Sequence, residues 1–156
     1  MVKLNSQGIE VDVPRGWDGE IYRRSKGFDA LDADGSIAKA VLHLGNFPLP
    51  AVRGDYGSNA VEAMGADHVL IVLFEFGHES VETALFKRRG LPQVRATDFA
   101  GHTLQRTLPG QSGAQYFFNE VGRAFCLYVV LGSHARRLEL VPEVNAVLAT
   151  IDLANL

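Results

Sequence analysis

Cysteine is almost absent from this chain: Cys126 is the single one among 156 residues. No disulfide can therefore form within the chain, and this cysteine usage is compatible with a reducing compartment. Long apolar runs are missing too. The main apolar runs cover only residues 69–74 and 125–131. They are far shorter than the roughly 20 residues that a membrane-spanning helix needs. The first residues lack the apolar core of a secretion signal, so we expect a cytoplasmic protein without membrane insertion.

An excess of charge of one sign is also lacking. Fifteen Lys and Arg against 18 Asp and Glu give a net charge of −3 and a pI near 5.9. Nucleic-acid-binding domains normally carry clustered basic residues, so we expect no nucleic-acid partner. With 47% hydrophobic and 21% charged residues, the composition is that of a folded globular protein. Its length predicts a single domain over residues 1–156.

The first half of the chain predicts strands. Ile9, Val11 and Val13 alternate with acidic residues, as in a strand with one wet face. A turn rich in proline and glycine follows at residues 14–19. Further strands are predicted at residues 20–24, at residues 36–44 and, as a central strand that is apolar on both faces, at residues 69–74.

The second half predicts helices and a hairpin. A short helix is expected over residues 58–64, and another over 79–89, where acidic residues come first and basic residues last. Strands at 115–119 and 123–131 are predicted to form an apolar hairpin. One further strand is considered as an interpretation of residues 102–108. A last helix is expected over 142–151, with Pro142 at its first position and an apolar face of Val144, Val147, Leu148 and Ile151. The predicted fold is α+β, an antiparallel sheet packed with two or three helices.

This order of elements resembles that of the PsbP-like fold superfamily. The shared features are a strand that ends in the turn Pro14-Arg15-Gly16-Trp17, a meander with an inserted helix, and an apolar hairpin closed by a C-terminal helix. The resemblance implies a PsbP-like sandwich. It also implies a binding function, because the superfamily contains mainly non-enzymatic proteins, among them a photosystem II extrinsic subunit and chaperones of secreted effectors. It supplies no catalytic residues.

Two segments bear a partial likeness to metal sites. His78 and Glu82 have the spacing of the helical zinc motif HExxH, but Glu82 stands where the second histidine belongs. Asp29, Asp32 and Asp34 precede Gly35 as in a calcium loop, but the first and last ligand positions of such a loop would be occupied by Ala30 and Val41. We therefore expect no metal and no other cofactor.

Two possible nucleophiles also have simpler interpretations. Ser112 lies in Gly110-Gln111-Ser112-Gly113, one residue away from the GxSxG pattern, and a strand follows where that motif requires a helix. Cys126 alternates within an apolar strand and has no basic neighbour in sequence that would lower its pKa, so we expect a buried residue. No catalytic residue is predicted.

Adjacent arginines offer the best candidates for a binding surface. Arginine and aromatic side chains are enriched at interface hot spots because they bury a large area and still form hydrogen bonds. The chain has three such pairs, Arg23-Arg24, Arg88-Arg89 and Arg136-Arg137. Aromatic residues lie close to the first pair. We therefore predict a partner-binding site at Trp17, Tyr22, Arg23 and Arg24.

The resulting hypothesis is a non-catalytic adaptor or chaperone-like module that binds an unidentified protein, with homodimer formation left open. The alternative is a small-ligand carrier or a cofactor-independent enzyme with a pocket between sheet and helix. Residues suited to such a pocket are Trp17, Tyr22, His78, His102 and Gln105. An enclosed cavity with convergent polar groups would favour the ligand hypothesis, whereas an apolar groove would favour the adaptor.

Overall fold

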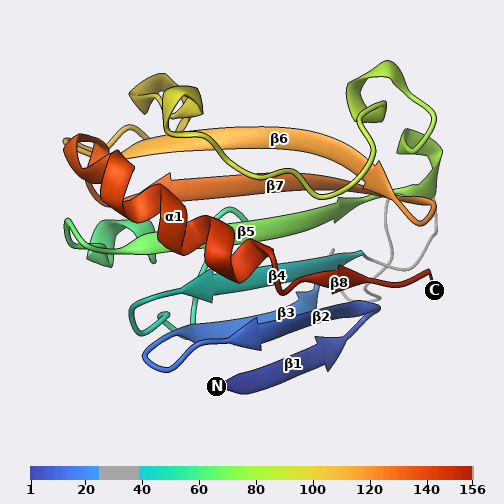
Figure 1. The fold of residues 1–156 in the computed structure, drawn as a ribbon, viewed down its shortest axis with the longest axis horizontal. Coiled ribbons are helices and arrows are strands. Elements are labelled where there is room, and N and C mark those ends of the chain that lie inside the picture. The colour runs from blue at the N-terminus through green and yellow to red at the C-terminus, as the bar shows by residue number, and fades with distance from the viewer. Residues whose placement is uncertain (25–38, 156) are drawn as a thin grey trace.

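A five-stranded antiparallel sheet forms the centre of the protein, whose computed structural model describes residues 1–24 and 39–155. The strands lie in the order β3-β4-β5-β7-β6 (Figure 1). They are β3 (Asp18–Arg23), β4 (Ala40–Gly45), β5 (Val69–Phe76), β6 (Ser112–Glu120) and β7 (Arg123–Leu131). Two predictions are confirmed here, because β5 is the central strand and β6 and β7 form the apolar hairpin.

A second, smaller antiparallel sheet consists of β1 (Val2–Ser6), β2 (Ile9–Val13) and β8 (Asp152–Leu153), in the order β1-β2-β8. Gln7 and Gly8 join β1 to β2 with φ angles of 54° and 70°. Two successive positive φ angles are typical of the tight type I′ turn that matches the twist of a hairpin. The apolar residues of β2 are buried, as their alternation predicted, whereas β1 and β8 were not predicted.

The helix α1 (Arg137–Leu148) packs on one face of the five-stranded sheet, which we call the helix-covered face (Figure 1). The three-stranded sheet contributes to the same apolar core. The predicted contacts of the last helix are confirmed for its buried residues Val144, Val147 and Leu148. The helix begins earlier than expected, so Pro142 lies inside it. Proline removes one backbone hydrogen bond there.

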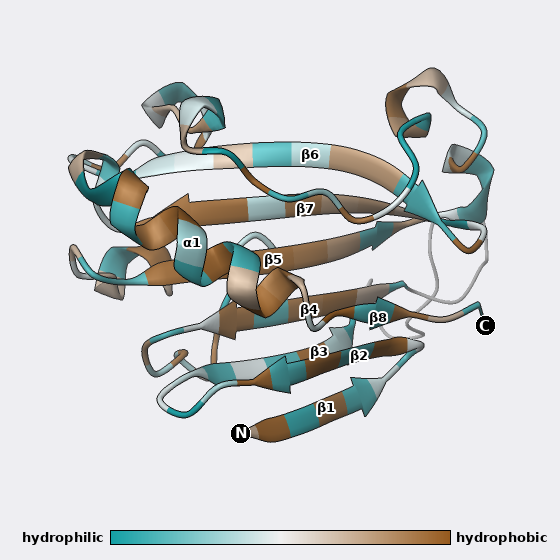
Figure 2. Ribbon diagram, in the orientation of Figure 1, coloured by the Kyte–Doolittle hydropathy of each residue, from teal (hydrophilic) through white to brown (hydrophobic). Residues whose placement is uncertain are grey.

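The opposite face of the five-stranded sheet, here called the loop-covered face, holds a second apolar cluster. Strands β4, β5 and β7 are buried along almost their whole length and are largely hydrophobic in Figure 2. Such strands must be covered on both sides. On this face the cover comes from connecting segments, through Phe47, Ala60, Val61 and Leu104.

The prediction of a helix over residues 79–89 is wrong. The chain forms two single-turn 3-10 segments there, His78–Ser80 and Ala84–Phe86. Phe86 is buried, but Leu85 is 59% exposed. A surface helix needs an apolar stripe several residues long, and a favourable order of charges does not replace it.

Two further local predictions also fail. Residues 58–64 contain only the 3-10 turn Val61–Ala63, and the strand considered at 102–108 is absent, since Gly101–Thr103 is another 3-10 turn. The expected α+β fold, with two or three helices packed on one antiparallel sheet, is therefore wrong. The described part of the chain is mostly sheet, arranged as two antiparallel sheets with one α-helix of 12 residues. No helix in residues 1–24 and 39–155 is long and apolar enough to cross a membrane.

Candidate functional site

Trp17 is positioned by the turn between β2 and β3. Its backbone N–H donates to the carbonyl oxygen of Pro14 at 3.0 Å, and Gly16 has a φ of +84°. This is the pattern of a type II turn, in which the third residue needs a positive φ and is therefore usually glycine. The turn leaves Trp17 half-buried against the core of the helix-covered face.

A groove of about 360 Å³ opens beside Trp17. Its other wall comes from β1, where Val2 is 63% exposed, and from Met1, which is 80% exposed. Strand β1 is the edge of its sheet, and no described strand pairs with its outer side. An unpaired edge next to exposed apolar side chains is a surface to which another chain can add.

The structure does not gather the four predicted partner-binding residues into one patch. Tyr22 belongs to the cluster of the loop-covered face, whereas Trp17 belongs to that of the helix-covered face. Arg23 is exposed, and its Nε donates to Oε1 of Gln7 at 2.8 Å. The Arg24 guanidinium lies 4.4 Å from the ring centre of Phe74. Trp17 and Arg23 therefore remain available at the surface, while Tyr22 and Arg24 pack within the fold.

The residues of the alternative pocket are also spread out. Trp17 lines the groove beside β1, whereas Gln105 lines a cavity on the loop-covered face. The Tyr22 hydroxyl donates to Asp55 at 2.8 Å. His78 and His102 are exposed in separate turns.

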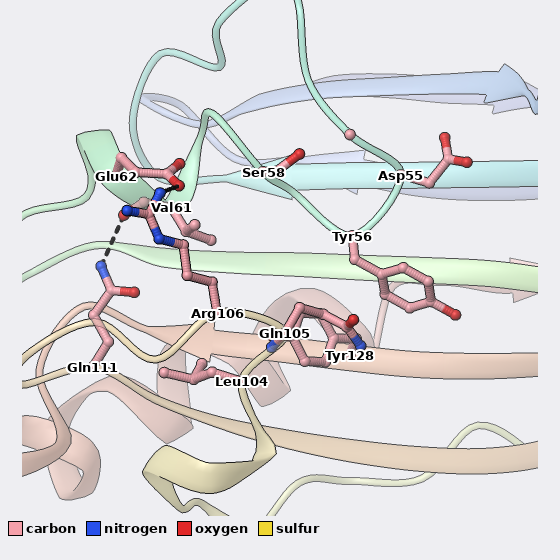
Figure 3. Close-up of a pocket in the computed structure, with 11 residues that line it drawn as sticks. Asp55, Tyr56, Ser58, Val61, Glu62, Leu104, Gln105, Arg106, Gln111 and Tyr128 are labelled. Atoms are coloured by element: carbon pink, nitrogen blue, oxygen red, sulfur yellow. Dashed lines mark hydrogen bonds and ion pairs between the residues drawn. The ribbon is translucent and has the colours of Figure 1, made fainter.

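A partly enclosed cavity of about 260 Å³ lies on the loop-covered face, where Tyr128 of β7 faces two connecting segments (Figure 3). The ring of Tyr56 stands nearly perpendicular to that of Tyr128, at 82° and with 5.6 Å between their centres. The cavity is lined by Gly54, Asp55, Tyr56, Ser58, Val61, Glu62, Leu104, Gln105, Arg106, Gln111 and Tyr128.

The polar groups of this cavity are held in place by hydrogen bonds. The Nε2 of Gln111 donates to the carbonyl oxygen of Val61 at 2.8 Å, and the backbone N–H of Gln105 donates to the Tyr128 hydroxyl at 2.9 Å. Burial raises the pKa of Tyr128, and it raises the pKa of Tyr56 to about 12. Both phenols therefore keep their protons at neutral pH.

One rim of the cavity depends on a buried histidine in β4. The Nε of Arg53 donates to Nδ1 of His43 at 2.9 Å, and His43 Nε2 lies 2.8 Å from the backbone oxygen of Asp55. These two contacts require the neutral tautomer with its proton on Nε2. Burial lowers the pKa of His43, which also favours the neutral ring. This network fixes the segment that carries Tyr56 into the cavity.

Metal-binding and nucleophilic groups do not form a further site in the described chain. No three His, Cys, Asp or Glu side chains among its residues lie close enough together to hold a metal ion. His78 and Glu82 are exposed, and Asp29, Asp32 and Asp34 lie outside the described residues. The Oγ of Ser112 is 2.9 Å from Nδ1 of His134, but Ser112 is fully buried and inaccessible to a substrate.

Comparison of the chain with family models, with curated proteins and with solved structures gave no match. The resemblance to the PsbP-like superfamily therefore stays a prediction.

Sequence reasoning missed most of the cavity. Tyr128 gave one usable signal, because a tyrosine inside an apolar strand needs a hydrogen-bond partner for its hydroxyl. The partner proved to be the backbone of Gln105, 23 residues earlier. Gln111 and Arg106 lie in segments without regular structure, and no pattern in the sequence places them beside Tyr128.

Proposed function

We propose that this protein is a non-catalytic protein-binding module, an adaptor or chaperone-like protein, whose partner docks along β1. The observation that carries the proposal is the apolar groove that Trp17 lines together with the exposed Met1 and Val2, beside the edge of β1 with which no described strand pairs. A partner segment in extended conformation would add to this edge by backbone hydrogen bonds, and its side chains would enter the groove.

Two of the predicted partner-binding residues fit this mode of docking. Trp17 lies near Val2 at the start of β1, and Arg23 contacts Gln7 just beyond the end of β1. An added strand would therefore pass both side chains, and tryptophan and arginine are residues that concentrate binding energy at interfaces. In this proposal Tyr22 and Arg24 support the fold and do not touch the partner.

The proposal includes a cytoplasmic location and a protein as the partner, with no role for nucleic acid or for a cofactor. The single buried cysteine and the slightly acidic composition support these choices. A homodimer would use the same edge, since two copies of β1 can pair across a two-fold axis.

The proposal is tested with Val2→Asp, which places a charge on the exposed groove wall. Val52→Asp is the matched control, because Val52 is also apolar and is 79% exposed, outside the groove. Cross-linking and capture from lysate of the source cell should recover a specific protein with the wild type and with Val52→Asp, but not with Val2→Asp. Light scattering shows whether that protein is a second copy. Equal capture by all three proteins would refute docking along β1.

A further inference from the structure

We propose that the cavity between Tyr56, Gln111 and Tyr128 binds a small planar ring compound that is neutral or positively charged and carries an N–H or O–H donor. This site is independent of the docking surface along β1. The cavity is lined by residues of the loop-covered face, whereas the Trp17 groove belongs to the helix-covered side of the molecule.

The size and walls of the cavity favour one ring system. Its volume of about 260 Å³ corresponds to roughly nine water molecules in the liquid. The perpendicular rings of Tyr56 and Tyr128, together with Leu104 and Val61, give it a largely apolar lining. A planar ring can contact the face of one tyrosine and the edge of the other, as aromatic pairs do.

Gln111 is the reason why the ligand needs a hydrogen-bond donor. Its Nε2 donates to the carbonyl oxygen of Val61, so the amide cannot be flipped and Oε1 must be an acceptor. This oxygen is buried and has no hydrogen-bond partner among the described residues. A buried acceptor without a donor is unfavourable, and an N–H or O–H group of a ligand would satisfy it.

Arg106 lines the same cavity as Gln111. Its guanidinium forms an ion pair with Glu62 at 2.9 Å, and its side chain is 68% exposed. Exposed ion pairs contribute little to stability, so a ligand can displace this side chain at small cost. The Tyr128 hydroxyl already accepts one hydrogen bond from Gln105, and its own proton can be donated to an acceptor on the ring compound.

The charges around the cavity disfavour an anion. Among the described residues, two carboxylates, Asp55 and Glu62, line it together with one cation, Arg106. A ligand carboxylate would meet this net negative charge and could not donate to Oε1 of Gln111. An amide meets no such repulsion, and a cation is attracted.

Three compounds of nearly the same shape separate these requirements: benzamide, benzamidinium and benzoate. Each is titrated into the full chain, and the amide resonances of Tyr56, Gln105 and Gln111 are followed by NMR. Benzamide and benzamidinium should shift these resonances at millimolar concentration. Benzoate should bind at least about tenfold more weakly, the effect of one lost polar contact.

A matched pair of variants tests the role of Gln111. Gln111→Leu should weaken benzamide about tenfold, whereas Gln93→Leu, at an exposed glutamine outside the cavity, should have no effect. The proposal is overturned if none of the three compounds shifts the cavity resonances, if benzoate binds as well as benzamide, or if Gln111→Leu and Gln93→Leu behave alike. If Gln111→Leu fails to fold, the relative affinities of the three compounds for the wild-type protein still test the proposal.

Discussion

The Arg123 guanidinium and the Glu75 carboxylate form a buried, two-pronged ion pair between β7 and β5 of the five-stranded sheet. Nε and one terminal nitrogen of Arg123 each lie 2.9 Å from a Glu75 oxygen, and both side chains are 5% exposed. The remaining N–H groups of Arg123 donate to the backbone oxygens of Gln7, Gly8 and Ala154, at the ends of the three-stranded sheet. All five donors of the guanidinium thus have acceptors.

Breaking this ion pair should strongly destabilise the protein. Glu75→Gln leaves the charge of Arg123 buried without its counter-ion, a change that costs about 3 to 5 kcal/mol in the free energy of unfolding. Urea denaturation measures the loss. Glu10→Gln, which alters an ion pair with the largely exposed Lys3, is the control and should leave the midpoint almost unchanged. Equal midpoints for the two variants would show that the buried ion pair does not stabilise the fold.

The packing of α1 can be tested with two neighbouring positions. Val147 is 3% exposed in the core, whereas Ala146 is on the outer side of the helix. Val147→Asp buries an unpaired carboxylate and should lower the free energy of unfolding by about 3 kcal/mol or more. Ala146→Asp should change it by less than about 0.5 kcal/mol. A Val147→Asp protein as stable as Ala146→Asp would mean that α1 does not dock on the sheet in solution.

Cys126 should react slowly with thiol reagents. It is fully buried in β7, as the sequence predicted, and burial raises the pKa of its thiol to about 11. The reactive thiolate is therefore scarce at neutral pH as well as shielded. Labelling with a chromogenic disulfide should take place only as the protein opens, and should be complete at once in denaturant. Rapid labelling in buffer alone would contradict the register of β7.

His43 should make stability fall on acidification. Its pKa is lowered in the fold, while in the unfolded chain it has its ordinary value of about 6.5. Below that pH the unfolded chain takes up a proton that the folded protein resists, so the contribution of His43 is complete above about pH 6.5 and is lost as the pH falls further. The melting temperature should therefore drop more steeply between pH 7 and 5 for the wild type than for His43→Gln. His102→Gln, at an exposed histidine, should retain the wild-type slope.

The two arginines of the first pair should behave differently. Arg24→Ala removes a guanidinium that lies over Phe74 and donates to the backbone oxygen of Glu75 at 3.0 Å, so we expect a lower melting temperature. Arg23→Ala removes an exposed side chain and should leave the melting temperature unchanged while weakening partner capture. Calorimetry of the two single variants distinguishes these effects. A loss of stability in Arg23→Ala alone would reverse the assignment.

Local patterns predicted the central strands and the last helix, but they failed for the two other helices and missed β1 and β8. The runs at 69–74 and 125–131 are rich in β-branched and aromatic residues and apolar on both faces, and a central strand satisfies both properties. At 79–89 the order of charges suggested a helix, yet Phe86 is the one buried side chain, and a helix gains most of its stability from packing. The two residues of β8 form a strand only because β2 lies beside them.

The candidate sites were harder to predict because they depend on contacts between distant residues. Trp17 was correctly expected at a turn, but its groove requires β1, a strand that was not predicted. Gln111 reaches Val61, 50 residues away, and Arg106 reaches Glu62, 44 residues away. Such contacts follow from the path of irregular segments, which hydrophobic periodicity does not determine.

We expect the loop-covered face to open without global unfolding. Its cover consists of single-turn segments and side-chain contacts, whereas the other face carries a 12-residue helix with its own hydrogen-bonded backbone. Segments of the first kind open at a lower free energy than the elements of a core. A molecule that binds beside Tyr128 binds to the closed form of these segments. It will therefore suppress their opening. Slower hydrogen exchange confined to these segments would then be the earliest sign that the cavity is occupied.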